Sequence, residues 1–300
     1  SPRQVDSYSL RYGDVLFNRT SETPEEIAYA TVYLDNKPAV FGSFVIRARP
    51  VDDRLEANFC KYVFQPAYVR EQMISRCQGA IRANIGQADL RKVKMLLPPK
   101  SEQGKISKIL STWDRAIEVT ERLILNSQTK KRALVQHLCT GKVRLAGFSK
   151  PWRKLKLAQL GPFKKGKGIR RDELVDQGLP CVLYGDIYTR HNDFIREFSS
   201  YTTSEVARTS ERISSGDLLF AGSGETAADI GKCVAFVDDF EAYAGGDIVI
   251  LSVKNDDSKF LAYLMNSASV IEQKARFGQG NSVVHISATN LGRISISLPV

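Results

Sequence analysis

Short apolar runs recur in two separate parts of the chain. They lie at 14–17, 30–34 and 40–49 in the first part, and at 217–220, 232–237 and 246–253 in the second. All six are rich in β-branched and aromatic residues and are bounded by Gly, Asp, Asn or Pro, which is typical of β-strands. Each group is followed by a helical stretch, at 57–77 or 258–276, and by a final apolar strand, at 93–98 or 294–299. The pattern predicts an α/β (α+β) protein with two domains, each built on a mixed β-sheet.

These two groups of elements form an internal repeat. Residues 13–23 read GDVLFNRTSET and residues 216–226 read GDLLFAGSGET, and the match continues without a gap at an offset of 203 positions. A second block at 59–98 matches 260–299 at an offset of 201. Because chance does not preserve this order over such a length, we infer that the chain holds two copies of one domain.

The repeat also sets the predicted boundaries. We predict a first domain at 1–98, a helical spacer at 99–146 and a second domain at 147–300. The second copy begins near Pro151, so by the same offset the first copy lacks roughly fifty N-terminal residues. We therefore expect the chain to be a fragment of a longer protein or to be incompletely described at its ends.

A different pattern fills residues 101–138, which contain no proline and a single glycine, Gly104, in the first turn. Apolar or small residues alternate at spacings of four and three: Ile106, Leu110, Trp113, Ile117, Thr120, Ile124, Ser127, Leu134 and Leu138. This spacing predicts a coiled-coil-like helix of ~57 Å, with Ser101 as its N-cap and Gly141 as its C-cap. We predict that the apolar seam packs on another helix, from this protein or a partner; packing on its own domain is the alternative.

Composition narrows the class of protein. The 300 residues carry 43 Lys+Arg and 33 Asp+Glu, a formal net charge of +10 that favours a polyanionic partner, although many basic proteins bind none. The sequence contains neither a run of ~18 apolar residues nor the apolar core of a signal peptide. The five cysteines are scattered and form no CxxC, which argues against a zinc ribbon or a disulfide framework. We predict a cytoplasmic protein with no membrane segment, no metal and no cofactor.

Motifs for catalysis are weak. GPFKKGKGI at 161–169 departs from a P-loop, because Gly168 stands where a Ser or Thr must bind Mg²⁺. The three histidines, His137, His191 and His285, lie in unrelated contexts and predict no Ser–His nucleophile. We therefore predict a protein that is not an enzyme; an enzyme with an unrecognised site is an alternative.

Basic residues and glycines alternate at 164–171, which reads KKGKGIRR. Its five basic side chains are Lys164, Lys165, Lys167, Arg170 and Arg171. We interpret the segment as a flexible loop that follows a phosphate backbone; a solvated surface loop is the alternative. The next segment adds stacking faces and base-edge donors. These are Tyr184, Tyr188, Arg190, His191 and Asn192.

Two loop tips differ between copies that otherwise share a framework. Residues 18–21 correspond to 221–224, and residues 79–82 correspond to 280–283. Divergent polar tips are expected of two domains that read different sequences, and equally of drift on exposed loops. The tip residues that we predict to contact DNA are Arg19, Ser21, Arg82, Ser223 and Asn281.

Several motifs resemble the DNA-specificity subunit of type I restriction–modification enzymes. They are GDVLFNRTSET, PAVFGSFVIR, LPPKSEQGKISKILSTWDRAIE, KKRALVQHLCTGKVRL and GKGIRRDELVDQGLPCVLYGDIY. The resemblance covers nearly the whole chain. The resemblance implies two target-recognition domains held apart by antiparallel helices. It also implies a non-catalytic subunit that directs methyltransferase subunits and a motor–nuclease subunit to a bipartite site in double-stranded DNA. The chain departs from the family pattern in two places. The first domain lacks its N-terminal part, and the second conserved helix, expected after Val300, is absent from the sequence.

From this resemblance we predict that the helix binds methyltransferase subunits. The predicted partner-binding residues are Ile106, Leu110, Trp113, Ile117, Ile124, Leu134 and Leu138. The alternative is a non-catalytic scaffold or antirestriction-type protein that binds methyltransferase subunits through the helix without reading DNA. The basic segment at 164–171 separates the two hypotheses, because a pure scaffold has no use for it.

Overall fold

The computed structural model describes residues 8–79, 81–280 and 282–299. Its contacts divide the chain into two compact units, 1–124 and 125–300, which we call unit 1 and unit 2 and describe separately. The predicted boundaries at 98 and 146 stay a prediction, because the division between the units falls inside one helix.

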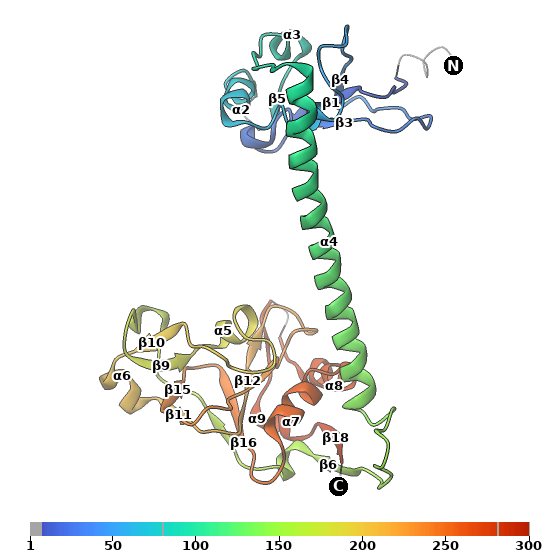
Figure 1. Ribbon diagram of the computed structural model, residues 1–300. Helices are drawn as coiled ribbons and strands as arrows, with labels where there is room; N and C mark the ends of the chain where they lie inside the picture. The colour runs from blue at the N-terminus through green and yellow to red at the C-terminus, as the bar shows by residue number, and fades with distance from the viewer. Residues whose placement is uncertain (1–7, 80, 281, 300) are drawn as a thin grey trace. The chain divides into compact units, whose positions relative to one another are not determined.

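Unit 1 is built on a three-stranded antiparallel sheet in the order β3-β1-β4 (Figure 1). The strands are β1 (Val15–Asn18), β3 (Ala30–Val32) and β4 (Val45–Ala48), and a two-stranded ribbon pairs β2 (Thr20–Ser21) with β5 (Ala83–Asn84). The helices are α2 (Ala67–Ile74) and α3 (Gln87–Leu90), with 3₁₀ turns η1 (Pro24–Glu26) and η2 (Phe59–Lys61). Val15, Phe17, Ile27 and Val69 are among the residues that form its core.

Unit 2 contains two larger sheets. The four-stranded sheet has the order β14 (Cys233–Ala235), β12 (Asp217–Ala221), β16 (Ile248–Ser252) and β7 (Phe163–Lys165). The five-stranded sheet has the order β11 (Glu211–Ile213), β15 (Ala242–Ala244), β9 (Leu179–Val182), β10 (Ser200–Thr202) and β8 (Leu174–Val175). The pair of β15 and β9 is parallel and its neighbours are antiparallel, so the predicted mixed sheet is confirmed in unit 2. The described strands of the unit 1 sheet pair antiparallel.

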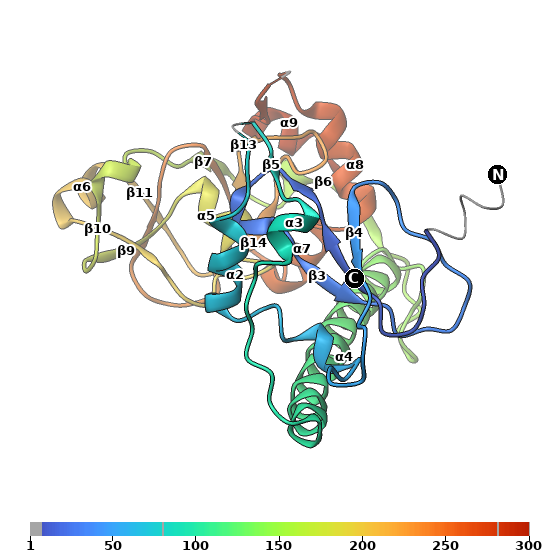
Figure 2. The same ribbon diagram turned by 90° about the horizontal axis from the view of Figure 1, so that it is seen from above.

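Ribbons and helices complete unit 2. The ribbons pair β13 (Ser223–Gly224) with β17 (Val284–His285) and β6 (Arg153–Lys156) with β18 (Ser295–Leu298). The helical elements are η3 (Leu157–Gln159), η4 (Arg171–Glu173), α5 (Tyr184–Thr189), α6 (Ser204–Thr209), α7 (Ser258–Met265), α8 (Ala268–Phe277) and α9 (Ala288–Gly292). Figures 1 and 2 both show the five-stranded sheet and α6 at one end of unit 2, away from α8.

Strand register in the two units confirms the repeat. Val15 pairs with Ala48 in unit 1, and the equivalent residues Leu218 and Leu251 pair in unit 2. The ribbon of β2 and β5 recurs as β13 and β17, again in the equivalent register. The two copies therefore share backbone pairing as well as sequence.

A glycine keeps the same backbone conformation at one loop tip of each copy. Gly79 and Gly280 have φ of +115° and +119°, which L side chains rarely adopt. A Cβ on Gly79 would lie 2.2 Å from the Arg82 carbonyl oxygen, and a Cβ on Gly280 would lie 2.1 Å from the Val283 carbonyl oxygen. Both tips thus keep one backbone shape while their side chains differ.

Two sequence expectations about these elements were wrong. The helical stretches at 57–77 and 258–276 are each broken in two, because Pro66 and Ser267 have extended backbone at the start of α2 and α8. Residues 93–98 form no strand in unit 1, whereas the equivalent β18 pairs with β6. A strand needs a hydrogen-bonded neighbour, and among the described residues of unit 1 no strand pairs with 93–98.

The long helix, α4, spans Lys100–Leu138. It begins one residue before the predicted N-cap, with the Glu102 N–H donating to the Pro99 carbonyl at 2.8 Å, so Ser101 lies within the first turn. Gly141, with φ of +71°, follows its end as predicted. The long helix joining the two domains is confirmed.

Each end of α4 packs on its own unit. In unit 1, the Gln103 amide donates to the Arg54 and Pro98 carbonyls, at 2.9 and 2.8 Å, and accepts from the Glu56 N–H at 2.8 Å. In unit 2, Cys139 after the helix is buried in the main core. Between these two ends, Leu110, Trp113, Ile117, Ile124 and Leu134 of the predicted seam stay exposed.

Candidate nucleic-acid interface

The basic segment at 164–171 is more tightly held than its composition predicts. Lys164 and Lys165 lie in β7, which pairs with β16, so they are not in a flexible loop. A Cβ on Gly166 would lie 2.1 Å from the Gly245 carbonyl oxygen, and a Cβ on Gly161 would lie 1.8 Å from that of Ser252. The glycines here allow close backbone packing, which fixes the backbone that carries the basic side chains.

Two of the five basic side chains have an acidic partner. The Lys164 ammonium lies 3.3 Å and the Lys167 ammonium 3.9 Å from the carboxylate of Glu211 in β11. Lys165, Arg170 and Arg171 are exposed, and no ion pair involves them within the described part of the chain. Of the five, these three are the most accessible to a phosphate, because no carboxylate competes with it for their charge.

The residues around α5 divide into exposed and structural groups. Tyr184 is 42% exposed at the start of the helix. The Tyr188 hydroxyl lies 3.0 and 3.1 Å from the carbonyl oxygens of Ser223 and Asp229, and burial raises its pKa to about 12. Tyr188 therefore ties α5 to the loop tip of unit 2, and its ring is less available for stacking than that of Tyr184.

His191 is buried, and burial lowers its pKa. Its carbonyl accepts a hydrogen bond from the Lys232 ammonium at 2.6 Å, and burial also lowers the pKa of Lys232. Neighbouring Arg190 is more exposed and lies 3.5 Å from the Asp186 carboxylate. Of His191 and Arg190, only Arg190 exposes its ionisable group to solvent.

The two predicted tips of unit 1 lie side by side. Pairing of Thr20 with Asn84 brings the loop that carries Arg19 next to the loop that carries Arg82, and both arginines are exposed. Ser21 is 9% exposed, and its hydroxyl donates to the Glu26 carboxylate at 3.2 Å. The arginines are therefore the accessible members of this set.

In unit 2 the equivalent ribbon holds Ser223 opposite His285. The Ser223 Oγ lies 2.9 Å from His285 Nδ1, and in unit 1 Thr20 Oγ1 donates to Asn84 Oδ1 at the same distance. Because Asn84 cannot act as a base for Thr20, the shared geometry favours a structural cross-strand pair over a nucleophile and its base. Asn281 lies outside the described residues.

Sequence reasoning missed two arginines that line polar cavities. Arg47 lines a cavity of about 570 Å³ beside Arg19, and its guanidinium lies 5.2 Å from the centre of the Phe41 ring. Arg196 lines a cavity of about 580 Å³ beside Arg190 and Asn192. The sequence held a signal for Arg47. Successive residues of a strand face opposite sides, so Arg47 faces away from the core that Ile46 enters.

The helical seam is largely exposed. Trp113 is 68% exposed, and Leu110, Ile117, Ile124 and Leu134 are between 38% and 56% exposed. Ile106 and Leu138, near the two ends, are half-buried. Single exposed apolar residues are ordinary, but a row along one helix marks an interaction surface. The geometry leaves the predicted partner surface open.

Within 8–79, 81–280 and 282–299, no cluster of three or more His, Cys, Asp and Glu side chains could hold a metal ion. No helix in these same ranges has the length and apolar character needed to cross a membrane.

Comparison with known proteins finds a family model that matches part of the chain and distant relatives that match more of it. Residues 3–126 match the family model described as the type I restriction modification DNA specificity domain. The type I restriction enzyme MjaVIII specificity subunit of Methanocaldococcus jannaschii is 22% identical over 256 residues, which cover 79% of this chain and 59% of that protein. This chain thus spans less than two thirds of the length of that relative.

Solved structures share the fold. The S subunit of the type I restriction–modification system from M. genitalium has a TM-score of 0.60 at 15% identity, over 98% of this chain and 73% of its own. A chain from a study of complex assembly and conformational transition of the type I R-M system has a TM-score of 0.53 at 18% identity, over 97% and 71%. Residues 3–126 thus match the type I restriction modification DNA specificity domain, and the chain is similar in fold to S subunits of type I restriction–modification systems.

Proposed function

We propose that this chain recognises specific sequences in double-stranded DNA and directs partner subunits to a bipartite site. The observation that carries the proposal is a duplicated scaffold with one backbone framework and two different exposed tips. Unit 1 presents Arg19 and Arg82, where unit 2 has Gly222 and Val283. A tip that differs in charge and donors reads different base edges, so each unit would read its own half-site.

Phosphate contacts would position each unit on the duplex without adding specificity. In unit 2 we assign this role to Lys165, Arg170 and Arg171, with Lys164 and Lys167 in support. Tyr184 and Arg190 would reach bases or sugars from α5. In this account Ser21, Ser223, Tyr188 and His191 hold the tips in place from behind.

A salt titration tests the phosphate contacts. The triple variant Lys165→Ala, Arg170→Ala, Arg171→Ala should weaken binding to all duplexes alike. The slope of log K against log salt should shrink by about 0.9 for each phosphate that the variant no longer neutralises. The matched control, Lys254→Ala with Lys259→Ala, removes two exposed cations of unit 2 outside the predicted set and should leave the slope almost unchanged. Equal slopes for the triple variant and the wild type would contradict the proposal.

The exposed seam of α4 supports the second half of the proposal, that methyltransferase subunits and a partner helix bind here. A motor–nuclease subunit would join through the same complex, catalysis would lie in these partners, and the complex would act in the cytoplasm. The double variant Trp113→Asp, Ile117→Asp should lose co-purification with the methyltransferase. The control, Glu118→Ala with Glu121→Ala, changes exposed residues beside the seam and should keep it. Wild-type recovery of the double variant would exclude the seam as the partner surface.

The scaffold alternative predicts a different result in the same assays. A protein that only binds methyltransferase subunits would lose nothing when its basic side chains are removed. Normal DNA recognition by the complex after the triple substitution, together with loss of methyltransferase binding by the seam variant, would favour that alternative.

A further inference from the structure

The ribbon of each unit presents one polar side chain that the predicted DNA contacts do not include. In unit 1 this residue is Asn84 of β5, and in unit 2 it is the equivalent residue of the repeat, His285 of β17. Both are exposed, and in each copy the residues immediately before and after are buried in the core. The two ribbons therefore hold different side chains at one equivalent and accessible position.

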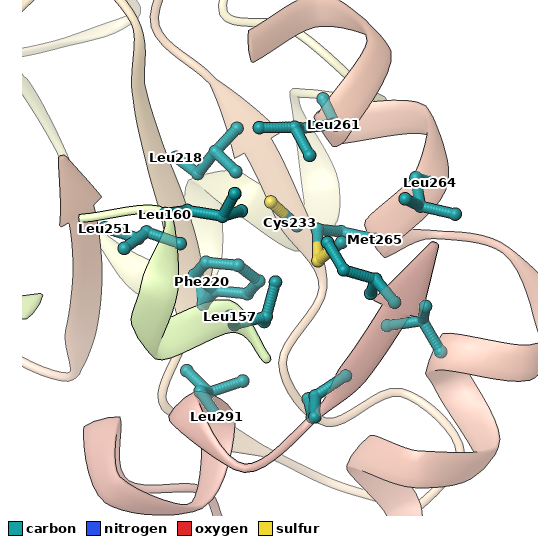
Figure 3. Packing of buried hydrophobic residues seen from close by; sticks show 14 of the residues in the cluster. Leu157, Leu160, Leu218, Phe220, Cys233, Leu251, Leu261, Leu264, Met265 and Leu291 are labelled. Carbon is teal, nitrogen blue, oxygen red and sulfur yellow. The ribbon is translucent and has the colours of Figure 1, made fainter. Parts of the chain in front are cut away.

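Backbone hydrogen bonds fix this position in both copies. In unit 2 the backbones of His285 and Gln279 exchange N–H···O=C bonds of 2.8 and 2.9 Å, and the Ile286 N–H donates to the Gly222 carbonyl at 2.9 Å. The equivalent three bonds in unit 1 measure 2.8, 2.9 and 3.0 Å. The strand that leads into the unit 2 ribbon, β12, packs Phe220 in the main core (Figure 3). Side chains on such strands are held more precisely than side chains on loops.

A hydroxyl on the neighbouring strand orients each of the two side chains. The Thr20 hydroxyl donates to Asn84 Oδ1, and the Ser223 Oγ lies at the same distance, 2.9 Å, from His285 Nδ1. The pair thus recurs in both copies although neither of its residues is the same. A side chain that is already held in one rotamer loses less conformational entropy when it binds a ligand.

The bonds that Asn84 makes within the unit leave one donor and one acceptor on its amide. Among the described residues, Oδ1 accepts from Thr20 and Nδ2 donates to the Arg82 carbonyl at 2.9 Å. A side-chain amide has two N–H hydrogens and two oxygen lone pairs, so one of each remains. A donor next to an acceptor matches N7 and N6 of adenine, which are the acceptor and the donor of its major-groove edge.

His285 offers a donor alone. The Ser223 side chain is 4% exposed, and His285 Nδ1 is the hydrogen-bond partner of its hydroxyl among the described residues. A buried hydroxyl needs an acceptor for its hydrogen. We therefore assign the acceptor role to Nδ1, which places the hydrogen of the neutral ring on Nε2. A single donor fits guanine, because N7 and O6 on its major-groove edge are both acceptors.

Both residues lie next to the DNA contacts that the sequence predicts. Asn84 is two residues from Arg82, and its ribbon holds the carbonyl of Arg19 through a backbone hydrogen bond. In unit 2 the Ser223 carbonyl accepts from the Tyr188 hydroxyl at 3.0 Å, which ties the ribbon to α5. The major groove of B-DNA is wide enough to admit a two-stranded β-ribbon.

We propose that Asn84 reads an adenine for unit 1 and that His285 reads a guanine for unit 2. Thr20 and Ser223 are the positioning residues of this pair of readers. The inference rests on the proposed function and deepens it, since it names residues that distinguish the two half-sites.

Exchange of the two pairs tests the proposal in the complete complex, by selection of bound duplexes from a random pool. The variant Ser223→Thr, His285→Asn gives unit 2 the pair of unit 1. It should prefer adenine where the wild type prefers guanine, with about a tenfold change in preference at one base pair. The reciprocal variant Thr20→Ser, Asn84→His should make the opposite change in the other block. Each introduced side chain already occupies the equivalent backbone position of the other copy, so both ribbons should stay folded.

A matched control separates His285 from its surroundings. Gln279→Asn shortens an exposed amide directly opposite His285, at a position that is glutamine in both copies. This control should select the same bases as the wild type. A control that changes the same base pair as the exchange would overturn the assignment to His285.

The positioning role of Ser223 has its own readout. Ser223→Ala leaves Nδ1 without its donor, so that either ring nitrogen can carry the hydrogen. The preference for guanine should fall about tenfold at one base pair, while the slope of log K against log salt stays the same. Ser223→Thr keeps the hydroxyl and should keep the preference. Equal weakening of all duplexes by Ser223→Ala, or an unchanged preference, would overturn the positioning role.

The wild-type selection distinguishes failure of this inference from failure of the proposed function. A wild-type complex that selects no sequence would overturn the proposed function and this inference with it. A wild type that selects two blocks, together with exchange variants that select the same bases, would overturn this inference alone.

Discussion

The two copies of the domain provide a hydrogen-bond donor for the same backbone carbonyl from different helix positions. In unit 2, the buried Lys274 donates to the Gly231 carbonyl at 2.7 Å, and its sequence equivalent in unit 1 is Met73. In unit 1, Arg70 lies one helical turn earlier and donates to the Ala28 carbonyl at 3.1 Å, which is the equivalent of the Gly231 carbonyl. The cation has moved along the helix, but the backbone oxygen that it satisfies is the same.

This comparison teaches which features the scaffold requires. A buried carbonyl needs a donor, and residues three apart on a helix share a face, so either position can supply it. Strand register and the positive φ at the tips are kept in both copies, whereas core residues and tip side chains vary. The backbone frame is thus the constant part, and the exposed side chains of the tips are free to differ between the units.

The largest expected difference concerns how well each core is covered. Phe220→Ala should destabilise unit 2 by about 3–5 kcal/mol, because it leaves a cavity inside a closed core. The equivalent Phe17→Ala should cost unit 1 about 2–3 kcal/mol, because Phe17, although 4% exposed, lines an apolar cavity of about 460 Å³ into which its surroundings can relax. Hydrogen exchange resolved by peptide measures each unit within the whole chain. Equal losses would show that the surroundings of Phe17 relax no more than those of Phe220.

The displaced cation gives the next test. Lys274→Met copies the residue of unit 1 and leaves the Gly231 carbonyl without its donor, which should cost about 1–3 kcal/mol. Adding Ile271→Arg to that variant restores a donor from the position of Arg70 and should recover most of the loss. Chemical unfolding at one pH measures both. A double variant no more stable than Lys274→Met would mean that the two arrangements are not interchangeable.

Stability should also depend on pH through this lysine. Burial lowers the pKa of Lys274 to about 8 from the ordinary 10.5. Between these values the unfolded chain binds more protons than the folded one, so stability rises with pH and the cost of burying the ammonium is fully present below pH 8. Relative to Lys274→Met, the wild type should gain about 1–2 kcal/mol between pH 8 and 10. A difference that does not change with pH would contradict the lowered pKa.

A smaller test compares backbone strain at equivalent turns of the two units. Ala28 has φ of +53° where Gly231 has φ of +70°. Ala28→Gly should stabilise unit 1 by about 0.5–1 kcal/mol, and Gly231→Ala should destabilise unit 2 by about 1–2 kcal/mol, since L residues are strained there. Thermal unfolding monitored in each unit would detect both. A gain on placing alanine at 231 would mean that the two turns differ in solution.

Much of the fold could be predicted from sequence because it depends on local pattern. Strand positions, the repeat and α4 were predicted from alternation, offset and heptad spacing. The break at Ser267 could not be, because it accompanies a distant contact: the Asn266 side chain beside it donates to the Cys233 carbonyl at 2.8 Å. The strand expected at 93–98 is absent in unit 1 because a strand also needs a neighbour, which periodicity does not report.

The candidate site was predictable in composition but not in accessibility. Sequence identified the basic segment and the divergent tips. It could not tell that Glu211, far along the chain, lies beside Lys164 and Lys167. It also could not tell that Ser223 is turned inward, because burial of a tip residue is decided by the ribbon that it joins.

The central claim is that one scaffold, present twice, reads two different half-sites. Selection of bound duplexes from a random pool, with the complete complex, tests it most directly. The wild type should select two blocks of bases around an unread spacer. The double variant Arg19→Gly, Arg82→Val, which gives unit 1 the tip residues of unit 2, should change one block and leave the other intact. A change in both blocks, or in neither, would contradict the account.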